Sequence, residues 1–410
     1  MPSRFAPPSR IRYRRMPPNP NPSLIFRKPS PSSRVHSLLL VANSLHFIVH
    51  YYLHLLEALW AAGYRLALLV PAGKREGKYQ QLPSEIPVYY LSNRQKDSGS
   101  WLELIWRGKY LVSIIAQVKP LAILSFTMAM NVPVSLAGRW LGIPVLPTLT
   151  GLGYFFTRQG IMARLAGMLC RIAFYHCPRV FFQNRADIRT FTVRDWVRED
   201  RAVLVEGAGI DRTYFRPQAY PKDGTPRTIL FLGRMQGDKG LHCLVESLRR
   251  LAHDGISFEC QLAGHAGGGH PTDIPQTVLD AWQAEGLVTL VGYRADVRPL
   301  LAGCHLLIQP SRREGLSRSI QEALACGRPI ISSTAPGCAD LVQESINGWL
   351  FCTDDAKSLY TLLRMICRLP YAKLLEMAAG TSATLPESQG NAAISRIYLE
   401  VLQEIRLCPS

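Results

Sequence analysis

The sequence predicts an α/β protein made of two doubly wound parallel sheets, and three observations lead to this prediction. A chain of 410 residues is too long for one ordinary core, so two domains are expected. Short apolar strands alternate with amphipathic helices along most of the chain, which is typical of parallel sheets covered by helices. The alternation is interrupted once, at residues 217–226, where the sequence YPKDGTP indicates a linker.

The first 34 residues are expected to form a disordered basic tail. Residues 1–34 are rich in Pro, Arg and Ser, hold eight Arg and Lys and no acid, and cannot bury a core. They also lack the apolar run of a secretory signal. Two interpretations stay open: a flexible basic arm near anionic lipid, or an extension without function, for example from a start codon assigned too early.

Residues 35–216 are expected to form the first doubly wound domain. Its strands are predicted at the short apolar runs 35–42, 65–70, 88–91, 121–125, 144–149, 180–183 and 202–205. Its helices are predicted at 48–62, 102–117, 132–141, 162–175 and 186–196. Residues 36–72 are poor in charge, but a turn at Gly63 divides this apolar stretch, so no membrane-spanning helix is expected there.

Residues 227–388 are expected to form the second domain, and residues 389–410 a final helical segment. Strands are predicted at 228–232, 258–263, 288–291 and 306–309. Helices are predicted at 241–252, 277–284, 317–326, 356–366, 371–379 and 392–405. Two similar halves joined by the short linker 217–226 predict a cleft between them, which is a usual place for a substrate.

The net charge of +17 restricts the class of partner. Residues 1–34 carry +8 of this charge and the rest of the chain carries +9. A positive body suits nucleic acid, an acidic membrane face or phosphorylated substrates. Nucleic acid is not expected, because aromatic and basic residues are not interleaved. The ten cysteines show no CxxC pair and no Cys/His metal spacing, so reduced core thiols of a cytosolic protein are expected and no metal site is predicted.

The rest of the chain is organised around residues 310–331, PSRREGLSRSIQEALACGRPII, where Glu314 and Glu322 stand eight residues apart. A buried strand precedes this stretch and Ser317 is a plausible N-cap of the helix that follows. The loop between them faces the crevice at the carboxyl ends of the strands, where Glu314 could hold sugar hydroxyls and Glu322 a ribose. Alternatively, these are ordinary glutamates of an amphipathic helix.

A second motif is FLGRMQGDKG at residues 231–240, a strand that ends in glycine and is followed by two cations. Arg234 and Lys239 could clamp a diphosphate and neutralise it as it departs. The alternative is a solvated loop with ordinary surface cations. The motif is weak alone and stronger together with the two glutamates about 80 residues later.

Two glycine-bearing turns follow other strands. Residues 206–211, EGAGID, indicate either a close approach of backbone to a ligand or a tight interdomain turn. Residues 148–154, TLTGLGY, could let a phosphate or sugar of an acceptor approach the backbone. Residues 148–154 lack the GxGxxG spacing of a dinucleotide fingerprint, and so does AGHAGGG at residues 263–269.

These motifs, taken together, resemble the retaining GT-B glycosyltransferases of carbohydrate-active family 4 over about residues 36–355. The stretches that carry the resemblance are SFTMAMNVPVSLAGRWLGIPVLPTLTGLGYFFT, VFFQNRADIRTF, EGAGIDRTYFRP, FLGRMQGDKG, AWQAEGLVTLVGYRADV and SRREGLSRSIQEALACGRPIISSTAPGCADLVQESINGWLF. Within the family, the chain is similar to bacterial enzymes of lipid-linked or capsular repeat units, of the N-acetylgalactosaminyltransferase type that acts on diacetylbacillosaminyl-diphospho-undecaprenol.

The resemblance implies two Rossmann-like domains that face each other across a cleft, with the C-terminal helix crossing back to the first. It also implies a UDP-sugar donor and no metal or other cofactor. The implied catalytic residues are Arg234, Lys239 and Glu314. In the implied donor site, Arg234 and Lys239, beside Gly233, bind the diphosphate, and the backbone of Gly315 and Leu316 lies near the phosphates. Glu314 contacts the donor sugar, and Glu322 binds the ribose.

The function implied is retaining transfer of a hexose, an N-acetylhexosamine, from a UDP-sugar to a polyprenyl-diphosphate-linked or polysaccharide acceptor. It would take place in the cytoplasm or at the inner face of the cytoplasmic membrane. The residues implied on the acceptor side are Asn43, Thr127, Thr150, Gly151 and Gly153.

Three positions depart from the family pattern. Ala129-Met130 stand where the family has Lys and Pro, His50-Tyr-Tyr52 replace Asn-Phe-Arg, and Ala339-Asp340 replace Arg-Glu. Two alternatives to transfer therefore stay open: a decayed GT-B protein that binds nucleotide-sugar, or another GT-B enzyme such as a nucleotide-sugar epimerase or a phosphorylase. Helix 161–175, with Arg164 and Arg171 among apolar residues, is either a membrane-surface helix or a core helix whose arginines reach solvent.

Overall fold

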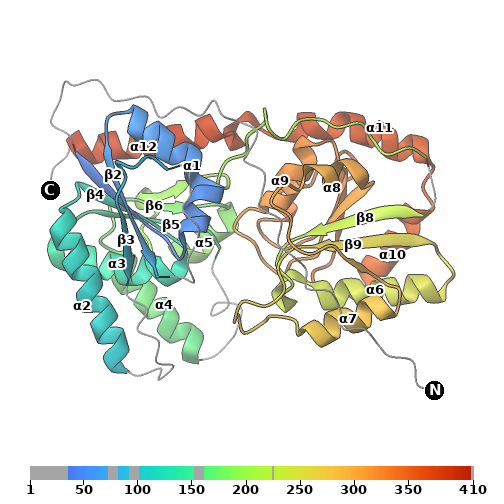
Figure 1. Cartoon of the computed structure of the whole chain (residues 1–410), viewed down its shortest axis with the longest axis horizontal. Helices are drawn as coiled ribbons and strands as arrows, with labels where there is room; N and C mark the ends of the chain where they lie inside the picture. Colours follow the sequence, from blue (N-terminus) through green and yellow to red (C-terminus); the bar gives the residue numbers. More distant parts are fainter. Residues whose placement is uncertain (1–35, 73–81, 92–100, 152–160, 224–225, 408–410) are drawn as a thin grey trace, which may run out of the picture.

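A computed structural model describes residues 36–72, 82–91, 101–151, 161–223 and 226–407. It contains two parallel sheets, each with helices on both faces, and the two halves lie side by side (Figure 1). The predicted α/β fold of two Rossmann-like, doubly wound domains is therefore confirmed. The predicted basic tail, residues 1–34, lies outside the described residues.

The N-terminal sheet has seven parallel strands in the order β3-β2-β1-β4-β5-β6-β7. The strands are β1 Ser37–Val41, β2 Arg65–Pro71, β3 Val88–Leu91, β4 Ala122–Phe126, β5 Val145–Leu149, β6 Val180–Phe182 and β7 Ala202–Leu204. The helices of this half are α1 Leu45–Ala61, α2 Trp101–Val118, α3 Met128–Leu141, α4 Ile161–Phe174 and α5 Arg185–Val193. Every predicted element of residues 35–216 is present, with ends that differ by a few residues.

Both faces of this sheet are buried, because side chains alternate along each strand. In β1, Leu38 and Leu40 enter the core under α1, whereas Leu39 and Val41 enter the core under α2, α3 and α4. Figure 1 shows α1 and the final helix α12 on one side of the sheet and α2, α3 and α4 on the other.

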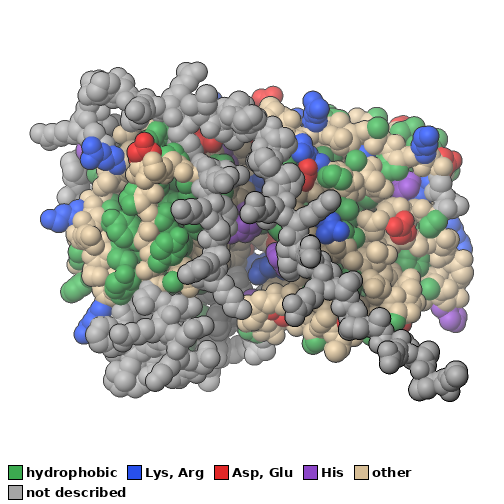
Figure 2. Space-filling model, in the orientation of Figure 1, with side chains coloured by type: hydrophobic (Ala, Val, Ile, Leu, Met, Phe, Trp, Pro, Cys, Tyr) green, Lys and Arg blue, Asp and Glu red, His purple; other side chains and the backbone are tan. Residues whose placement is uncertain are grey.

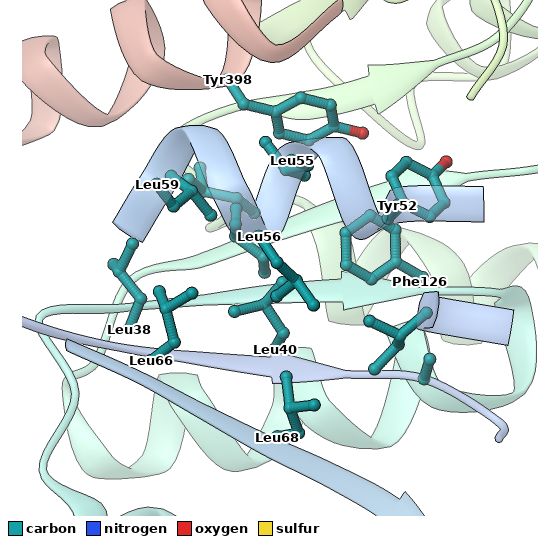
Figure 3. Packing of buried hydrophobic residues seen from close by; sticks show 14 of the residues in the cluster. Leu38, Leu40, Tyr52, Leu55, Leu56, Leu59, Leu66, Leu68, Phe126 and Tyr398 are labelled. Carbon is teal, nitrogen blue, oxygen red and sulfur yellow. The ribbon is translucent and has the colours of Figure 1, made fainter. Parts of the chain in front are cut away.

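The final helix, α12 Asn391–Leu407, crosses back and packs on α1, as predicted. Its Tyr398 is buried over Tyr52, Phe126 and Phe181, and its hydroxyl lies 2.9 Å from the Thr148 hydroxyl of β5 (Figure 3). The C-terminal end of the chain is thus part of the N-terminal core.

The C-terminal sheet has six parallel strands in the order β10-β9-β8-β11-β12-β13. The strands are β8 Arg227–Leu232, β9 Phe258–Ala263, β10 Thr289–Leu290, β11 Leu306–Gln309, β12 Ile330–Ser333 and β13 Gly348–Phe351. The helices are α6 Leu241–His253, α7 Gln276–Ala284, α8 Arg298–Gly303, α9 Arg318–Ala325, α10 Ala356–Cys367 and α11 Tyr371–Thr381. Strands β12 and β13 and helix α8, of four to six residues each, were not predicted.

The chain passes between the two halves twice, near Ile210 and near Gln389, and the two passages lie side by side. Ile210 donates its N–H to Gln389 O at 3.0 Å, and Asn391 donates to Ile210 O at 3.2 Å. His54 of α1 contacts Ala208 O at 2.7 Å and Ser395 Oγ of α12 at 2.8 Å. The backbone at Gly209 has φ +90°, and a Cβ there would lie 2.7 Å from Asn391 Oδ1. The turn 206–211 therefore lies at the interdomain crossing, where glycine is required.

None of the helices in the described ranges is long and apolar enough to span a membrane.

The packing of Tyr398 predicts a large effect of truncating it. We expect Tyr398→Ala to lower the free energy of unfolding by about 3–5 kcal/mol, because it opens a cavity between α12 and the N-terminal sheet. Tyr398→Phe loses only one hydrogen bond and should cost about 1 kcal/mol. Urea unfolding of both variants measures the difference. Equal stability of the two variants would contradict the packing described.

Glu57 of α1 predicts a pH dependence of stability. Burial, with a smaller contribution from Asp211, raises the pKa of Glu57 to about 7, and Glu57 Oε1 has no hydrogen-bond partner among the described residues. A carboxyl whose pKa is raised by folding stabilises the fold at low pH, and this stability is lost as the pH rises through about 7.

We therefore expect Glu57→Gln to raise the melting temperature relative to wild type at pH above about 7, and to change it little at pH below about 5. The exposed Glu400→Gln in α12 is the control. Equal shifts of Glu57→Gln at both pH values would contradict the prediction.

Candidate active site

Two loops at the carboxyl ends of neighbouring strands form the centre of the candidate site. One loop follows β8 and runs from Gly233 to Gly240, and the other follows β11 and leads into α9. Glu314 lies in the loop before α9 and Glu322 lies inside α9, as the sequence predicted. Because β8 and β11 are adjacent and parallel, the two loops meet at the same edge of the sheet.

An ion pair joins the two loops. Lys239 Nζ lies 2.6 Å from Glu314 Oε1, and both side chains are largely buried. Burial alone lowers the pKa of Lys239, but the Glu314 carboxylate outweighs it, so the pKa of Lys239 is raised. The amine therefore remains charged.

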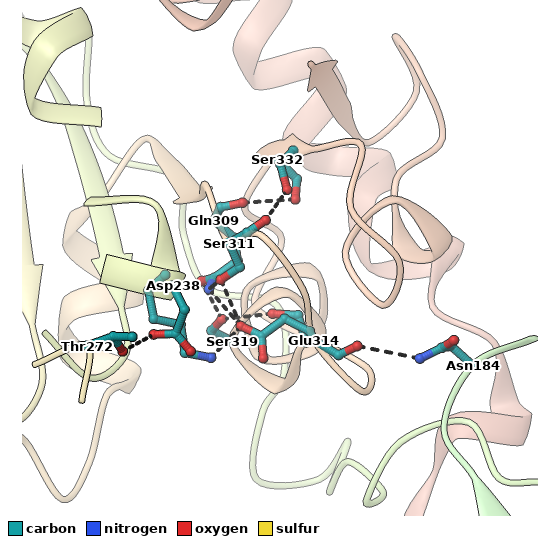
Figure 4. A network of polar contacts seen from close by, with 11 residues as sticks. Asn184, Asp238, Thr272, Gln309, Ser311, Glu314, Ser319 and Ser332 are labelled. Carbon is teal, nitrogen blue, oxygen red and sulfur yellow. Dashed lines mark hydrogen bonds and ion pairs between the residues drawn. The ribbon is translucent and has the colours of Figure 1, made fainter. Parts of the chain in front are cut away.

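Other polar groups fix the Glu314 carboxylate in this position (Figure 4). Ser311 Oγ donates to Glu314 Oε1 at 2.8 Å, and Gln309 Nε2 donates to the same oxygen at 3.2 Å. Ser319 Oγ in turn donates to Gln309 Oε1 at 2.8 Å. A carboxylate held by three donors is preorganised, so it does not have to reorganise when a ligand arrives.

The second predicted cation, Arg234, is exposed on the same loop as Lys239. Its positive charge acts on the pKa of Lys239 and of Tyr51 in α1, so the guanidinium lies near both side chains. Gly233, before Arg234, donates its N–H to Ala263 O at 3.0 Å, which fixes the start of the loop. The structure thus brings the two predicted cations together.

Glu322 has a partner that the sequence prediction missed. Arg318 Nε donates to Glu322 Oε1 at 2.9 Å, and Arg318 Nη1 donates to Gly209 O at 3.0 Å. The Arg318 guanidinium also lies 5.3 Å from the centre of the Tyr51 ring in α1. Burial raises the pKa of Glu322, and Arg318 opposes this shift. The i, i+4 spacing of Arg318 and Glu322 in a predicted helix could have indicated this ion pair.

The start of α9 differs from the prediction in one respect. Ser317 occupies the N-cap position, but its side chain makes no hydrogen bond to the helix backbone. Its hydroxyl lies 3.1 Å from Ser319 Oγ instead, and its N–H donates to Gly337 O. The Gly337 turn is held in turn by Asp340 Oδ2, which accepts the Gly337 N–H at 2.9 Å.

The Glu314 loop also contacts the N-terminal domain. Asn184 Nδ2 donates to Gly315 O at 2.6 Å, and Arg313 forms an ion pair with the buried Asp187 of α5. A Cβ at Gly315 would lie 2.7 Å from Thr150 O, so only glycine permits this approach. The next residue, Leu316, is partly buried against the core of the C-terminal domain.

The predicted acceptor-side residues follow three strands of the N-terminal sheet. Asn43 is exposed after β1, Thr127 follows β4, and Thr150 and Gly151 follow β5. A Cβ at Gly151 would lie 3.3 Å from Gly315 N, so this turn borders the Glu314 loop. Thr127 has φ +70° and a buried hydroxyl without a hydrogen-bond partner among the described residues. Gly153 lies outside the described residues.

A stacked pair of histidines on α1 was not predicted. The rings of His46 and His50 are 5.3 Å apart and nearly parallel, and His50 contacts the edge of Tyr51. Figure 2 shows a hollow between the two halves in which histidine and Lys or Arg side chains are visible. The spacing of four residues between His46 and His50 could have indicated that the two rings are neighbours on a helix.

No group of three or more His, Cys, Asp and Glu side chains in the described part of the chain is arranged to hold a metal ion.

The fold is that of the GT-B glycosyltransferases. The structure of HepE from Anabaena in complex with UDP and glucose has a TM-score of 0.69 and 19% identity, covering 90% of this chain and 100% of HepE. Sucrose-phosphate synthase from Thermosynechococcus elongatus has a TM-score of 0.73 and 16% identity, covering 91% and 99%. At these identities the likeness concerns the fold.

The C-terminal domain matches a known sequence family. Residues 226–368 match the family described as Glycosyl transferases group 1. The chain is similar to the N,N'-diacetylbacillosaminyl-diphospho-undecaprenol alpha-1,3-N-acetylgalactosaminyltransferase of Campylobacter jejuni, with 25% identity over 324 residues, 76% of this chain and 84% of that enzyme.

It is also similar to AmsK, an amylovoran biosynthesis glycosyltransferase of Erwinia amylovora, with 29% identity over 45% of this chain and 48% of AmsK. The chain spans about half the length of several curated relatives that it matches.

The contact at Gly315 predicts that an added methyl group separates the loops. We expect Gly315→Ala to increase the radius of gyration in small-angle X-ray scattering and to lower the free energy of unfolding by about 1–3 kcal/mol. Gly303→Ala is the control, because a Cβ at Gly303 has no neighbour within 4 Å. Unchanged scattering and stability in Gly315→Ala would mean that the two loops do not touch in solution.

Proposed function

We propose that the protein is a retaining glycosyltransferase that moves a sugar, an N-acetylhexosamine, from a UDP-sugar to a polyprenyl-diphosphate-linked or polysaccharide acceptor. The observation that carries the proposal is the buried Lys239–Glu314 ion pair at 2.6 Å, with Arg234 exposed beside it. Support comes from the group 1 family match over residues 226–368, from the C. jejuni relative named above and from the UDP bound to HepE.

Arg234 and Lys239 are proposed to bind the diphosphate of the donor. The cations lie on one loop near each other, and Lys239 remains charged because of Glu314. Charge-assisted hydrogen bonds to phosphate oxygens are among the strongest hydrogen bonds in proteins. The backbone of Gly315 and Leu316, at the entry to α9, is proposed to lie near the same phosphates.

Glu322 is proposed to bind the ribose hydroxyls, and Glu314 the transferred sugar. Glu322 is already paired with Arg318 through Oε1, so the ribose would share this carboxylate with the guanidinium. Arg318 thereby becomes a positioning residue, since it also holds the interdomain segment at Gly209 O.

In the proposed reaction the acceptor hydroxyl attacks the anomeric carbon on the face that the nucleotide leaves. The bond between the anomeric carbon and the phosphate oxygen breaks, the new glycosidic bond forms, and the acceptor proton passes to the departing phosphate oxygen. The role of the protein is electrostatic, because Arg234 and Lys239 stabilise the charge that develops on the diphosphate. These two cations supply the counter-charge, so no metal or other cofactor requirement is expected.

The acceptor is proposed to enter from the N-terminal domain, along Asn43, Thr127, Thr150, Gly151 and Gly153. The protein is proposed to work in the cytoplasm, at the inner face of the cytoplasmic membrane.

Release of UDP tests the proposal. Wild type is incubated with a panel of UDP- and GDP-sugars, with and without polyprenyl-diphosphate-sugar acceptors. Acceptor-dependent release is expected with a UDP-sugar. Lys239→Ala should lower the rate about a hundredfold, which corresponds to about 3 kcal/mol of lost transition-state stabilisation, and Glu322→Ala should weaken donor binding. The exposed Lys373→Ala in α11 is the control.

An epimerase and a decayed transferase would each give a different result in the same assay. Conversion of the donor without acceptor would indicate an epimerase. Binding of UDP-sugar without release under any acceptor would indicate a decayed transferase. Failure to bind any nucleotide would overturn the proposed function.

A further inference from the structure

One long segment of the N-terminal domain contains basic residues and no acid. The chain from residue 104 to residue 186 contains no Asp or Glu. It contains nine basic residues: Arg107, Lys109, Lys119, Arg139, Arg158, Arg164, Arg171, Arg179 and Arg185. Most of α2 and all of α3 and α4 belong to this segment, and the three helices pack side by side on one face of the sheet (Figure 1). This face therefore attracts anions.

The outer side of α4 is apolar and exposed. Leu165, Met168, Leu169 and Ile172 are 50%, 57%, 45% and 45% exposed. Their spacing of three and four residues places them on one face of the helix. Contiguous apolar patches of this kind are rare on soluble monomers and mark interaction surfaces.

The inner side of α4 packs separately. Cys170, Ala173 and Phe174 are buried in the N-terminal core. Gly167 lies against Trp196, where a Cβ would meet the indole ring. The core thus uses one face of α4 and leaves the exposed apolar face without a partner among the described residues. Helix α4 is thus a core helix whose arginines reach solvent and which also carries an exposed apolar face.

Cations flank the exposed face of α4. Arg164 and Arg171 are both exposed, and Arg171 pairs with Asp195 at 2.7 Å in an ion pair that solvent weakens. Arg139 and Trp140 are exposed at the end of the neighbouring helix α3, and Trp140 is 75% exposed. Aromatic and basic side chains next to an apolar stripe are typical of helices that lie in the plane of a membrane interface.

We infer that the outer face of α4, formed by Leu165, Met168, Leu169 and Ile172 with Arg164 and Arg171, docks on an anionic lipid bilayer. The aliphatic side chains enter the boundary between headgroups and acyl chains, and the arginines contact lipid phosphates. This inference does not depend on the transfer reaction, because none of these residues belongs to the donor loops.

The charge distribution favours a bilayer over a second copy of the chain. In a two-fold symmetric dimer the same patch meets itself, so the arginines of both copies would face each other. Asp195 pairs with Arg171 in each copy, but residues 104–186 supply no acid for Arg164 and Arg139 in such an interface. An anionic bilayer supplies both the apolar layer and the opposite charge.

The test is sedimentation of the full-length protein with vesicles of phosphatidylcholine, with and without phosphatidylglycerol. Wild type is expected to bind the vesicles that contain phosphatidylglycerol. The double variant Met168→Glu, Leu169→Glu should bind them at least about tenfold more weakly, because it removes apolar contacts and adds repulsion. The matched control is Met365→Glu, Leu375→Glu, which alters two exposed apolar residues of α10 and α11 in the other domain.

A second variant tests the contribution of charge to vesicle binding without affecting the stability of the fold. Arg164→Gln should weaken binding about threefold at low salt and leave the melting temperature unchanged, since the side chain is exposed.

Three results would overturn the inference. The first is no sedimentation of wild type with phosphatidylglycerol vesicles. The second is equal binding by wild type and the α4 double variant, which would place the lipid contact elsewhere in the chain. The third is a wild-type dimer that the α4 double variant dissociates, without vesicle binding, which would assign the face to a second copy.

Discussion

The Lys239–Glu314 ion pair is the interaction on which the candidate site depends. It joins the loop after β8 to the loop after β11, and both side chains are largely buried. Removing one partner of such a pair leaves an uncompensated buried charge, which costs about 3–5 kcal/mol in proteins. Gln309, at the end of β11, and Ser311 donate hydrogen bonds to the Glu314 carboxylate, and this carboxylate in turn pairs with Lys239.

The same loop determines how the two domains meet. Asn184 and Asp187 of the N-terminal domain contact the backbone and side chain next to Glu314, and Gly315 allows the approach. The contact between the domains and the charged site therefore share the same loop. The proposed membrane-docking face on α4 belongs to the same N-terminal domain as the predicted acceptor-side residues.

Much of the fold could be predicted from the sequence, because buried parallel strands and amphipathic helices leave periodic apolar patterns. Strands β12 and β13 and helix α8 were missed, because they follow closely on the loop and helix of the Glu314 motif or on β10 and have no separate apolar period of their own. The loop positions of Glu314 and Lys239 followed from strand ends and glycines. The pairing of Arg318 with Tyr51, and of Asn184 with Gly315, could not be predicted, because these residues are far apart in the chain and only the packing of the domains brings them together.

A crystal structure of the protein with UDP would test the central claim most directly. The account predicts the diphosphate between Arg234 and Lys239, with the ribose hydroxyls on Glu322 and the Lys239–Glu314 pair retained. UDP bound elsewhere, or a diphosphate that contacts neither cation, would contradict it.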